Sequence, residues 1–542
     1  MTTQSTPEDN NQNSPSASTS SASQPPANQG LGETLVPFAG LRGDLARRLP
    51  VYIHDFTHGF HPKVLASILF LFFACLANAI AFGGLTELVT GGAIGTVEMI
   101  VATAVGGIAF AIFSGQPLII LGGTGPIVIF TGILYASCEQ FGLPFLPVYA
   151  WVGLWSGAFL VLLSIFNLSY LMREFTRFTD EIFAALIAVI FIVEAAKNTA
   201  SPFMQAGASD ATQLLTLVLA LGTFSLARGL RGFGATPYAS KRAREFISDF
   251  GPAIAIAVMT GFAIYEGAVA VEMPAVPDEF ATTTGRPWKV DLFSIPVPII
   301  LGSAIPALMA TILLFLDENI TARLVNAPGH KLTKGAGYHL DLLVVGLITI
   351  GCSLFGLPWI VAATVHAINH VKSLADTKKV DIGAGQHVEV ITKVRQTRLS
   401  GLGIHALIAG SIFFLPLIKM IPMAVLFGLF LYMGFATLTG NQFWSRVTLW
   451  VTDRGLYPDT HYLRGVPNKV IHKFTVVQVV ALTSLWVLKT SALGILFPAL
   501  IAALAFVRKG IGRWFKEEHL NALDADEAVD EADSGSTTSL AP

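Results

Sequence analysis

The sequence is poor in charged residues. Asp, Glu, Lys and Arg together make up 13% of its 542 residues, about half of the roughly 25% that is typical of soluble domains. Hydrophobic residues account for 53%, and the mean hydropathy is +0.62. This composition excludes an ordinary soluble globular protein and indicates that most of the chain lies in lipid.

Several other signals are missing. The three cysteines, Cys75, Cys138 and Cys352, lie far apart without CxxC spacing, so we expect buried free thiols rather than disulfides or a thiolate metal site. The net charge is −2 and no block of basic residues indicates a nucleic-acid partner. No HExxH, GxSxG or P-loop pattern supports an enzyme or a cofactor. No cationic start followed by an apolar stretch indicates a cleavable signal peptide.

The two ends of the chain are polar. Residues 1–40 are rich in Ser, Thr, Asn, Gln and Pro, which predicts a disordered tail. Residues 41–62 form an amphipathic segment that we expect to lie at the membrane interface. Its histidines, His54, His58 and His61, have near-helical spacing for a metal, but Gly59 and Pro62 interrupt the helix. Residues 515–542 are acidic and predict a solvated cytoplasmic tail, with partner docking as the alternative.

Apolar segments long enough to cross a membrane recur through residues 63–510. We therefore predict an all-α polytopic membrane protein with fourteen transmembrane segments. Their approximate ranges are 63–83, 95–113, 117–137, 146–167, 180–196, 210–228, 248–266, 296–324, 339–355, 358–372, 400–417, 421–438, 472–488 and 492–507. Lys and Arg gather in alternate loops, which by the positive-inside rule places the N- and C-termini in the cytoplasm.

Two of these spans are interrupted. In the first, an apolar run after Pro117 breaks at Gly122-Gly123-Thr124-Gly125; in the second, Pro358 precedes a short apolar run that ends at Thr364. Backbone groups in lipid need protein partners, so such breaks are tolerated only where they are buried or line a cavity. Paired breaks in two halves of a chain indicate a secondary transporter built from inverted repeats, with its substrate between two half-helices.

The predicted orientation makes the two half-helices start near mid-membrane, with their N-termini facing each other. A helix N-terminus carries free N–H donors and about half a positive charge, so the pair forms an anion site without a cationic side chain. We expect the donors to be the backbones around Thr124, Gly125, Thr364 and Val365, with the two threonine hydroxyls beside them.

The span at 296–324 carries two unexpected acids, Asp317 and Glu318. A carboxylate inside a membrane helix costs about 2.5 kcal/mol or more, which makes it a functional candidate. Asp317 and Thr321 share a helix face at i, i+4 spacing. Together with unwound backbone carbonyls they form an oxygen cage that suits Na⁺. The alternative is a structural acid that pairs with Arg323, an interpretation that applies more readily to Glu318.

His366 and His370 lie one turn apart on the second half-helix. Such a pair relays a proton or holds a metal in some proteins, whereas imidazoles hydrogen-bonded within a helix bundle are commoner. The sequence leaves both interpretations open, with His366 and Glu318 as the candidates for a proton or tuning role.

The chain resembles the membrane domain of the bicarbonate transporter family, which includes band 3 anion exchangers, sodium-bicarbonate cotransporters and borate transporters. The resemblance covers about residues 40–515. Its motifs include Asp55-Phe56-Thr57, Gly115-Gln116-Pro117-Leu118, Thr124-Gly125-Pro126, Trp151-Val152-Gly153-Leu154-Trp155, Phe175-Thr176-Arg177-Phe178-Thr179, Gly337-Tyr338-His339-Leu340-Asp341-Leu342, Tyr462-Leu463-Arg464 and Arg508-Lys509-Gly510.

The resemblance implies a seven-plus-seven inverted repeat with a core domain (about 63–167 and 296–417) and a gate domain (about 175–267 and 421–507). It also implies a homodimer and an elevator-like movement of core against gate. Asp317, Thr321 and the run Val361-Ala362-Ala363-Thr364 match positions similar to the cation site of the sodium-coupled branch. Anion exchangers carry a Glu in place of Asp317 and an Arg in place of His366.

We therefore expect a secondary transporter of the inner or plasma membrane that carries bicarbonate or carbonate together with Na⁺. The alternative is an exchanger of borate or another inorganic anion, or a proton-linked transporter. Near the C-terminus, Leu523-Asp524-Ala525-Asp526 resembles an acidic motif proposed to recruit carbonic anhydrase in exchangers.

Overall fold

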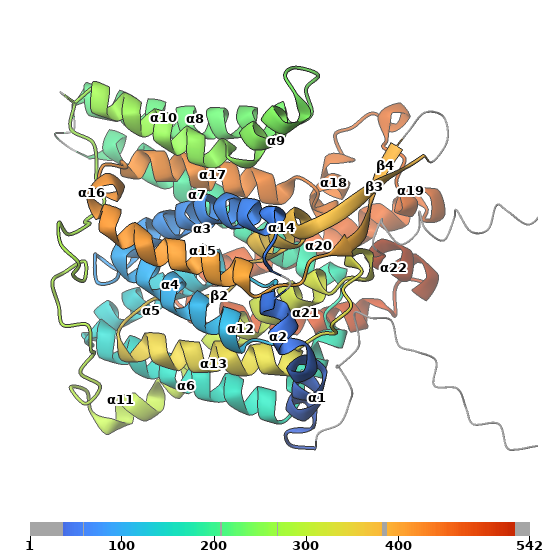
Figure 1. The fold of residues 1–542 in the computed structure, drawn as a ribbon, viewed down its shortest axis with the longest axis horizontal. Helices are drawn as coiled ribbons and strands as arrows, with labels where there is room; N and C mark the ends of the chain where they lie inside the picture. The colour runs from blue at the N-terminus through green and yellow to red at the C-terminus, as the bar shows by residue number, and fades with distance from the viewer. Residues whose placement is uncertain are drawn as a thin grey trace, which may run out of the picture.

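The computed structural model describes residues 36–57, 59–205, 207, 209–267, 269–381 and 387–525. The fold is a bundle of long, nearly parallel helices (Figure 1). The first half contains α1 Ala39–Arg48, α2 Tyr52–Thr57, α3 Pro62–Val89, α4 Thr96–Phe113, β1 Leu121–Gly122, α5 Gly125–Phe141, α6 Phe145–Ile165, α7 Arg177–Met204, α8 Asp210–Phe233, α9 Lys241–Asp249 and α10 Gly251–Tyr265.

The second half contains α11 Val297–Gly302, α12 Ala304–Val325, α13 Tyr338–Leu354, β2 Val361–Ala362, α14 Thr364–Leu374, β3 Ala375–Asp381, β4 His387–Val394, α15 Leu399–Gly410, α16 Leu415–Ile418, α17 Met423–Leu438, α18 Gln442–Thr448, α19 His461–Gly465, α20 Asn468–Thr490, α21 Phe497–Ile511 and α22 Glu517–Asp524. Short 3-10 turns join several of them: η2 Leu49–Val51, η3 Leu168–Glu174, η4 Pro328–His330, η5 Ser411–Phe414, η6 Arg454–Leu456 and η7 Gly494–Leu496.

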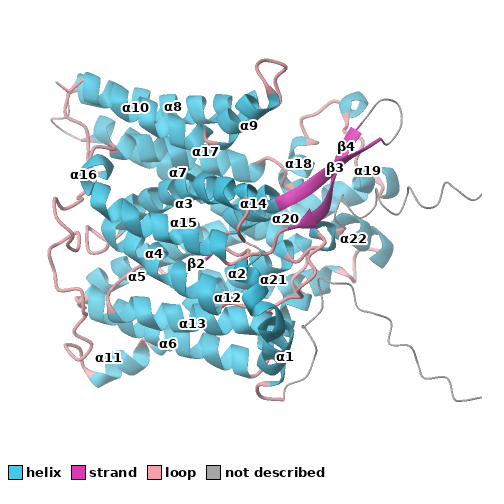
Figure 2. Ribbon diagram, in the orientation of Figure 1, coloured by secondary structure: helices cyan, strands magenta, loops and turns pink. Residues whose placement is uncertain are grey.

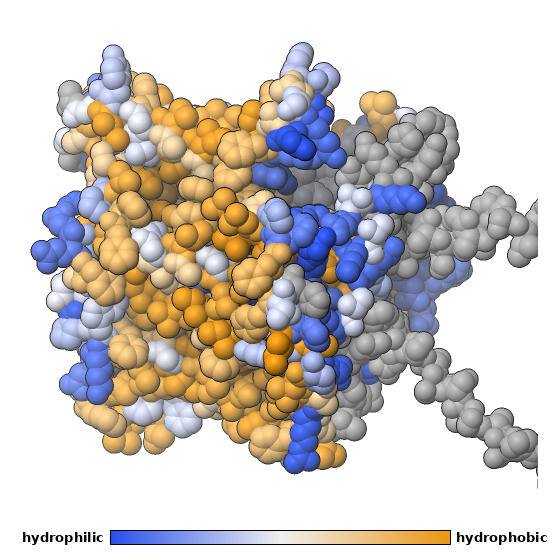
Figure 3. All heavy atoms as spheres, in the orientation of Figure 1, coloured by the Kyte–Doolittle hydropathy of each residue, from blue (hydrophilic) through white to orange (hydrophobic). Residues whose placement is uncertain are grey.

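A helix occupies each of the fourteen predicted ranges. Among the described residues, 8 helices are long and apolar enough to cross a membrane, or 10 if each of two bent pairs forms one span. The apolar side chains form a broad band over the body of the bundle, with hydrophilic residues at its two ends (Figure 3). The polytopic helical fold is therefore confirmed, and the count of fourteen spans stays a prediction.

The helices pack in two sets. α3, α4, α6, α12, α13 and α15 pack mainly on one another, and α7, α8, α10 and α17 form the second set. The second set lies along the upper edge in Figure 1. Contacts of α3 with α10 and α17, and of α5 with α7, join the two sets. The exact division into core and gate domains stays a prediction.

Small residues allow a close helix contact between α6 and α13. A Cβ at Gly157 would lie 2.6 Å from the carbonyl oxygen of Gly346, and a Cβ at Gly346 would lie 3.0 Å from that of Gly157. Without a hydrophobic drive between helices in lipid, such close backbone packing is a main source of helix association. The predicted buried thiols are confirmed, since Cys75, Cys138 and Cys352 are free and buried.

The prediction of helices alone missed a two-stranded hairpin. β3 and β4 pair antiparallel from Ala375↔Val394 to Asp381↔His387, with a bulge between Asp376 and Thr377 (Figure 2). The segment is polar between spans, which suggests a loop, yet it is rich in Val, Ile and Thr, which favour strands.

The amphipathic segment at 41–62 is not a simple surface helix, because its charged residues Asp44, Arg48 and Asp55 are buried in the protein. Asp44 accepts the backbone N–H groups of His339 (2.8 Å) and Leu340 (2.9 Å), and Arg48 donates to the Gly335 carbonyl oxygen at 2.5 Å. Burial raises the pKa of the Asp44 carboxyl and lowers the pKa of the Arg48 guanidinium to about 10. These contacts fasten α1 to the start of α13.

Both terminal predictions need correction where the structure describes them. Residues 36–40 are ordered: the Phe38 N–H donates to the Ile165 carbonyl at 2.7 Å. The acidic tail starts with a docked helix, α22, whose Leu520 and Leu523 are buried. Its two apolar positions, three residues apart, form a packing face that the surrounding charges conceal in the sequence. The rest of the predicted tails, 1–35 and 526–542, lies outside the described residues.

Candidate functional site

The two predicted breaks meet in the centre of the bundle. β1 and β2 pair antiparallel, with Leu121 opposite Ala362 and Gly122 opposite Val361. The Ala363 N–H extends this pairing by donating to the Ile120 carbonyl at 2.9 Å. This ladder supplies hydrogen-bond partners for backbone groups that lie outside any helix. A buried break in a membrane span requires such partners.

Each strand leads directly into a helix. Thr124 is the extended residue (φ −128°, ψ 149°) before α5, with Pro126 in the first turn, and Ala363 (φ −88°, ψ 96°) precedes α14. Proline is favoured in a first helical turn because the turn leaves its missing N–H unused. The interruptions at Thr124 and Thr364 are therefore confirmed, and the chain has two half-helices.

One helix holds both half-helix starts. Asp317 on α12 accepts a hydrogen bond from the Thr124 hydroxyl, with 2.8 Å between Oγ1 and Oδ2. One turn further, the hydroxyl oxygens of Thr321 and Thr364 lie 2.6 Å apart. The i, i+4 spacing places both contacts on one face of α12. Four predicted site residues from three separate segments therefore come together.

The remaining predicted residues lie around this cluster. Val361, Ala362 and Ala363 are buried in and beside β2, where only their backbone groups are polar. A Cβ at Gly125 would lie 2.7 Å from the Phe191 ring, so α7 covers the start of α5. The side chain of Val365 is 62% exposed and contributes nothing to the cluster.

The alternative interpretation, in which a structural acid at Asp317 or Glu318 pairs with Arg323, is wrong. Arg323 ion-pairs with Asp180 and donates to the Phe175 carbonyl at 2.7 Å, at the start of α7. Asp317 is 7% exposed and Glu318 1% exposed, and neither forms an ion pair with any residue that the structure describes. The site thus holds two buried acids without a cationic side chain.

The histidines make hydrogen bonds that fit a structural role. His370 uses both ring nitrogens: Nδ1 lies 2.9 Å from the Leu118 carbonyl and Nε2 lies 2.7 Å from the Ser400 hydroxyl. His366 Nε2 lies 3.3 Å from the Ala74 carbonyl. His370 thus links α14 to the segment before β1. A proton role of His366 stays a prediction.

Several supporting residues escaped sequence reasoning. The Asn78 amide donates to the Gly123 carbonyl at 3.1 Å, and Asp341 Oδ1 accepts the N–H groups of Gly115 (2.7 Å) and Gln116 (3.0 Å). Asn78 is a lone amide within an apolar run, and Asp341 lies within a predicted span. A polar residue at such a position indicates a side chain that forms hydrogen bonds with non-helical backbone groups inside the membrane.

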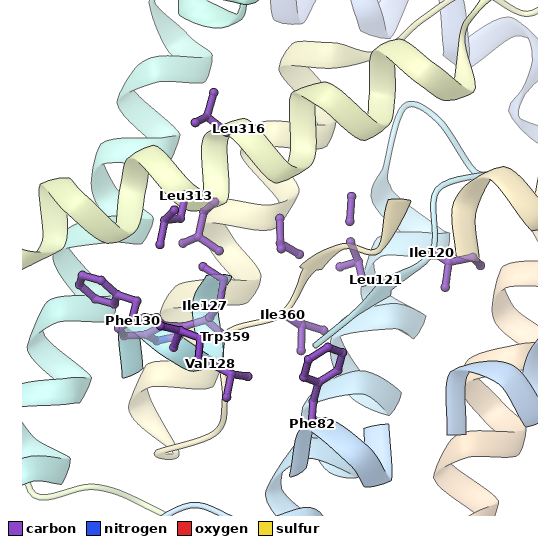
Figure 4. Packing of buried hydrophobic residues seen from close by; sticks show 14 of the residues in the cluster. Phe82, Ile120, Leu121, Ile127, Val128, Phe130, Leu313, Leu316, Trp359 and Ile360 are labelled. Carbon is purple, nitrogen blue, oxygen red and sulfur yellow. The ribbon is translucent and has the colours of Figure 1, made fainter. Parts of the chain in front are cut away.

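Aromatic rings close the site on two sides. Phe82 of α3, Phe191 of α7 and Phe430 of α17 lie with ring centroids 5.7 Å from one another. Trp359, just before β2, stacks on Tyr149 at 4.2 Å. Figure 4 shows Phe82 and Trp359 beside the strands, with Leu313 of α12 on the side that faces them. The two acids and Thr321 are thus buried, whereas Thr124 and Thr364 are half-buried.

A polar cluster at two interrupted helices inside a helical membrane bundle is the arrangement of a secondary transporter. The profile described as the HCO3⁻ transporter integral membrane domain matches residues 36–208 and 203–528. The chain therefore belongs to the bicarbonate transporter family, a family of multi-pass membrane transporters and not of enzymes.

Named relatives agree with this assignment. The chain is 36% identical to the band 3 anion transport protein of Homo sapiens over 92% of this chain and 57% of that protein. It is 35% identical to the electrogenic sodium bicarbonate cotransporter 1 of Oryctolagus cuniculus over 90% of this chain and 52% of that protein. The chain thus spans about half the length of the curated relatives it matches.

A solved structure shares the fold. The transmembrane domain of the cyanobacterial bicarbonate transporter BicA superimposes with a TM-score of 0.54 at 16% identity, covering 78% of this chain and 97% of that chain. At this identity the likeness concerns the fold alone.

Proposed function

We propose that this protein carries bicarbonate or carbonate across the membrane together with Na⁺. The observation that supports it most directly is the buried Asp317 carboxylate, which contacts a threonine hydroxyl and has no cationic partner among the described residues. A carboxylate in a low-dielectric interior needs a compensating charge. A cation that travels through the site supplies it.

The donor set suits Na⁺ better than a transition metal. Asp317, Thr321, Thr364 and Thr124 offer carboxylate and hydroxyl oxygens, and Val361, Ala362 and Ala363 offer carbonyl oxygens near the break. Hard cations take oxygen ligands, whereas transition metals favour imidazole and thiolate. Among the residues that the structure describes, no three His, Cys, Asp or Glu side chains cluster for a metal.

The anion is expected at the half-helix starts. α5 and α14 begin at Gly125 and Thr364, next to the two ends of the ladder between β1 and β2. Their N-termini supply free N–H donors and partial positive charge to a small planar anion. One Na⁺ with each bicarbonate would also remove the electrical penalty of about 2.3 kcal/mol per charge at 100 mV.

The proposed transport cycle moves the six-helix set, together with the half-helices α5 and α14, against the set formed by α7, α8, α10 and α17. This proposal is supported by the contact of Phe82 of α3 with Phe191 of α7 and Phe430 of α17, which is an apolar contact between the two helix sets. We further propose a homodimer in the inner or plasma membrane with cytoplasmic termini. α1 and α22 lie at the same end of the bundle, as such a topology requires (Figure 1).

Exchange of bicarbonate, borate or another inorganic anion is the second candidate, because the chain is 36% identical to the band 3 anion transport protein and 35% identical to the sodium bicarbonate cotransporter, which does not separate the two activities. One assay separates the two. Purified protein in proteoliposomes is given labelled bicarbonate or borate, with Na⁺ in one arm and choline in the other. Uptake of bicarbonate that requires Na⁺ supports the proposal, whereas equal uptake in choline that depends on an internal anion supports exchange.

A further inference from the structure

α20 and α21 border an open hollow at the edge of the bundle. Its volume is 320 Å³, and it is lined by Val477, Val507, Gly510, Ile511, Arg513 and Trp514. The hollow opens sideways, since Trp514 is 78% exposed and Val507 38% exposed. Pockets of about 300 Å³ or more are large enough for a ligand.

The wall of the hollow continues as an apolar surface along both helices. Val476 and Val480 of α20 are 50% and 59% exposed, and Phe506 of α21 is 75% exposed. Both helices are long and apolar enough to cross a membrane. Exposed apolar side chains on such helices face acyl chains, so the hollow opens toward lipid rather than toward bulk water.

Two cations lie at the polar end of this hollow. Arg513 is part of its lining, and Lys473 lies one helical turn before Val477 on the same face of α20. Both are exposed, and neither pairs with a carboxylate of the described chain. The neighbouring cations differ, since Arg508 pairs with Asp524 and Lys509 with Glu174.

We propose that this hollow binds one anionic phospholipid of the adjacent leaflet. The lipid phosphate lies between Arg513 and Lys473, and the upper part of an acyl chain follows Val477, Val507 and Ile511. Trp514 marks the level of the headgroups, where Trp is enriched in membrane proteins. The apolar wall favours a lipid over free phosphate, because inorganic phosphate gains nothing from apolar contact.

Native mass spectrometry of the full chain tests the charge requirement. The protein in detergent is mixed with phosphatidylglycerol or phosphatidylcholine, and retained lipids are counted. We expect R513A/K473A to lose one phosphatidylglycerol per chain, with about a fivefold loss of affinity for each cation removed. The matched control R454A/K378A removes two exposed cations elsewhere and should retain lipid as the wild type does. Equal retention by R513A/K473A and wild type overturns the proposal.

A second variant tests the apolar wall with the cations intact. A Cβ at Gly510 meets no heavy atom within 4 Å, so Gly510→Leu fills the hollow without a backbone clash. We expect it to release phosphatidylglycerol, while Gly229→Leu, at an equally open helical position, does not. Retention of phosphatidylglycerol by Gly510→Leu overturns a lipid site in this hollow. Unchanged melting temperatures establish folding, and neither readout depends on transport.

Discussion

Asp317→Asn removes the negative charge at the site and keeps the shape of the side chain. The amide keeps the size of the carboxylate, and its oxygen can still accept the Thr124 hydroxyl, which lies 2.8 Å from Asp317 in the wild type. Folding should be unaffected or slightly improved, because the variant removes a buried charge that has no cationic partner among the described residues. Loss of protein yield or melting temperature is therefore not expected.

The expected loss of Na⁺ affinity follows from Coulomb's law. A carboxylate and a cation about 4 Å apart attract by about 4 kcal/mol at an effective dielectric constant of about 20. Removing that attraction weakens Na⁺ binding by about 100- to 1,000-fold, since each 1.4 kcal/mol is about tenfold. Bicarbonate uptake at ordinary Na⁺ concentrations should then fall to background.

The assay is initial uptake of labelled bicarbonate into proteoliposomes over a series of Na⁺ concentrations. Asp278→Asn makes the same chemical change at a carboxylate whose side chain is 83% exposed, and it should follow the wild-type curve. If Asp317→Asn keeps the wild-type dependence on Na⁺, the carboxylate is not the cation ligand and the proposed coupling fails.

Three further changes probe the surroundings of the site and the C-terminal helix. Thr364→Val removes the hydroxyl 2.6 Å from Thr321 and should weaken Na⁺ binding about five- to tenfold in the same assay, while Thr364→Ser stays near wild type. Gly125→Ala puts a Cβ 2.7 Å from the Phe191 ring and should stop uptake, and a second change, Phe191→Ala, should restore part of it. Leu523→Asp places a charge at a buried position of α22; limited proteolysis should then cleave after residue 511 faster than in wild type, whereas the exposed change Glu518→Gln should leave cleavage unaltered.

The docked helix α22 also bears on the acidic motif near the C-terminus. Leu523 is 1% exposed, and Asp524 accepts the Phe178 N–H at 3.1 Å and binds Arg508 at 2.7 Å. These two positions of the motif are therefore engaged within the chain. Asp526 lies outside the described residues. Recruitment of carbonic anhydrase through Leu523 and Asp524 would require α22 to leave its position.

The breaks and the acid face could be predicted because their signals are local. Pro117, Pro358 and the Gly122–Gly123 pair interrupt apolar runs that are otherwise helical, and the four-residue spacing of Asp317 and Thr321 fixes a shared face. Their side-chain partners could not be predicted. Thr124 and Asp317 are 193 residues apart, and no periodicity specifies which distant hydroxyl meets a given carboxylate.

The packing of side chains around the site could not be predicted from the sequence either. Membrane spans are apolar on nearly every side, so the sequence gives no face that points to Phe191 or Phe430. The alternative that paired Arg323 with Glu318 fails for a related reason: Glu318 is near in sequence, but Arg323 binds Asp180, which lies near the start of α7. In an apolar interior, the helix packing determines which carboxylate lies next to a cationic side chain. Separation along the sequence therefore predicts such ion pairs poorly.

The position of Asp317 gives a physical reason for coupling in the proposed mechanism. An ionised Asp317 next to the start of α5 satisfies the positive end of that helix and repels an anion that approaches the same N–H groups. A bound Na⁺ neutralises the carboxylate and leaves both half-helix starts free to attract the anion. The ladder of β1 and β2 and the contacts of α12 hold the two half-helix starts together. In the proposed mechanism, Na⁺ and the anion therefore bind to the same structural unit. Linkage then requires bicarbonate to raise Na⁺ affinity by the same factor by which Na⁺ raises bicarbonate affinity, which titration of each ion at several concentrations of the other would measure.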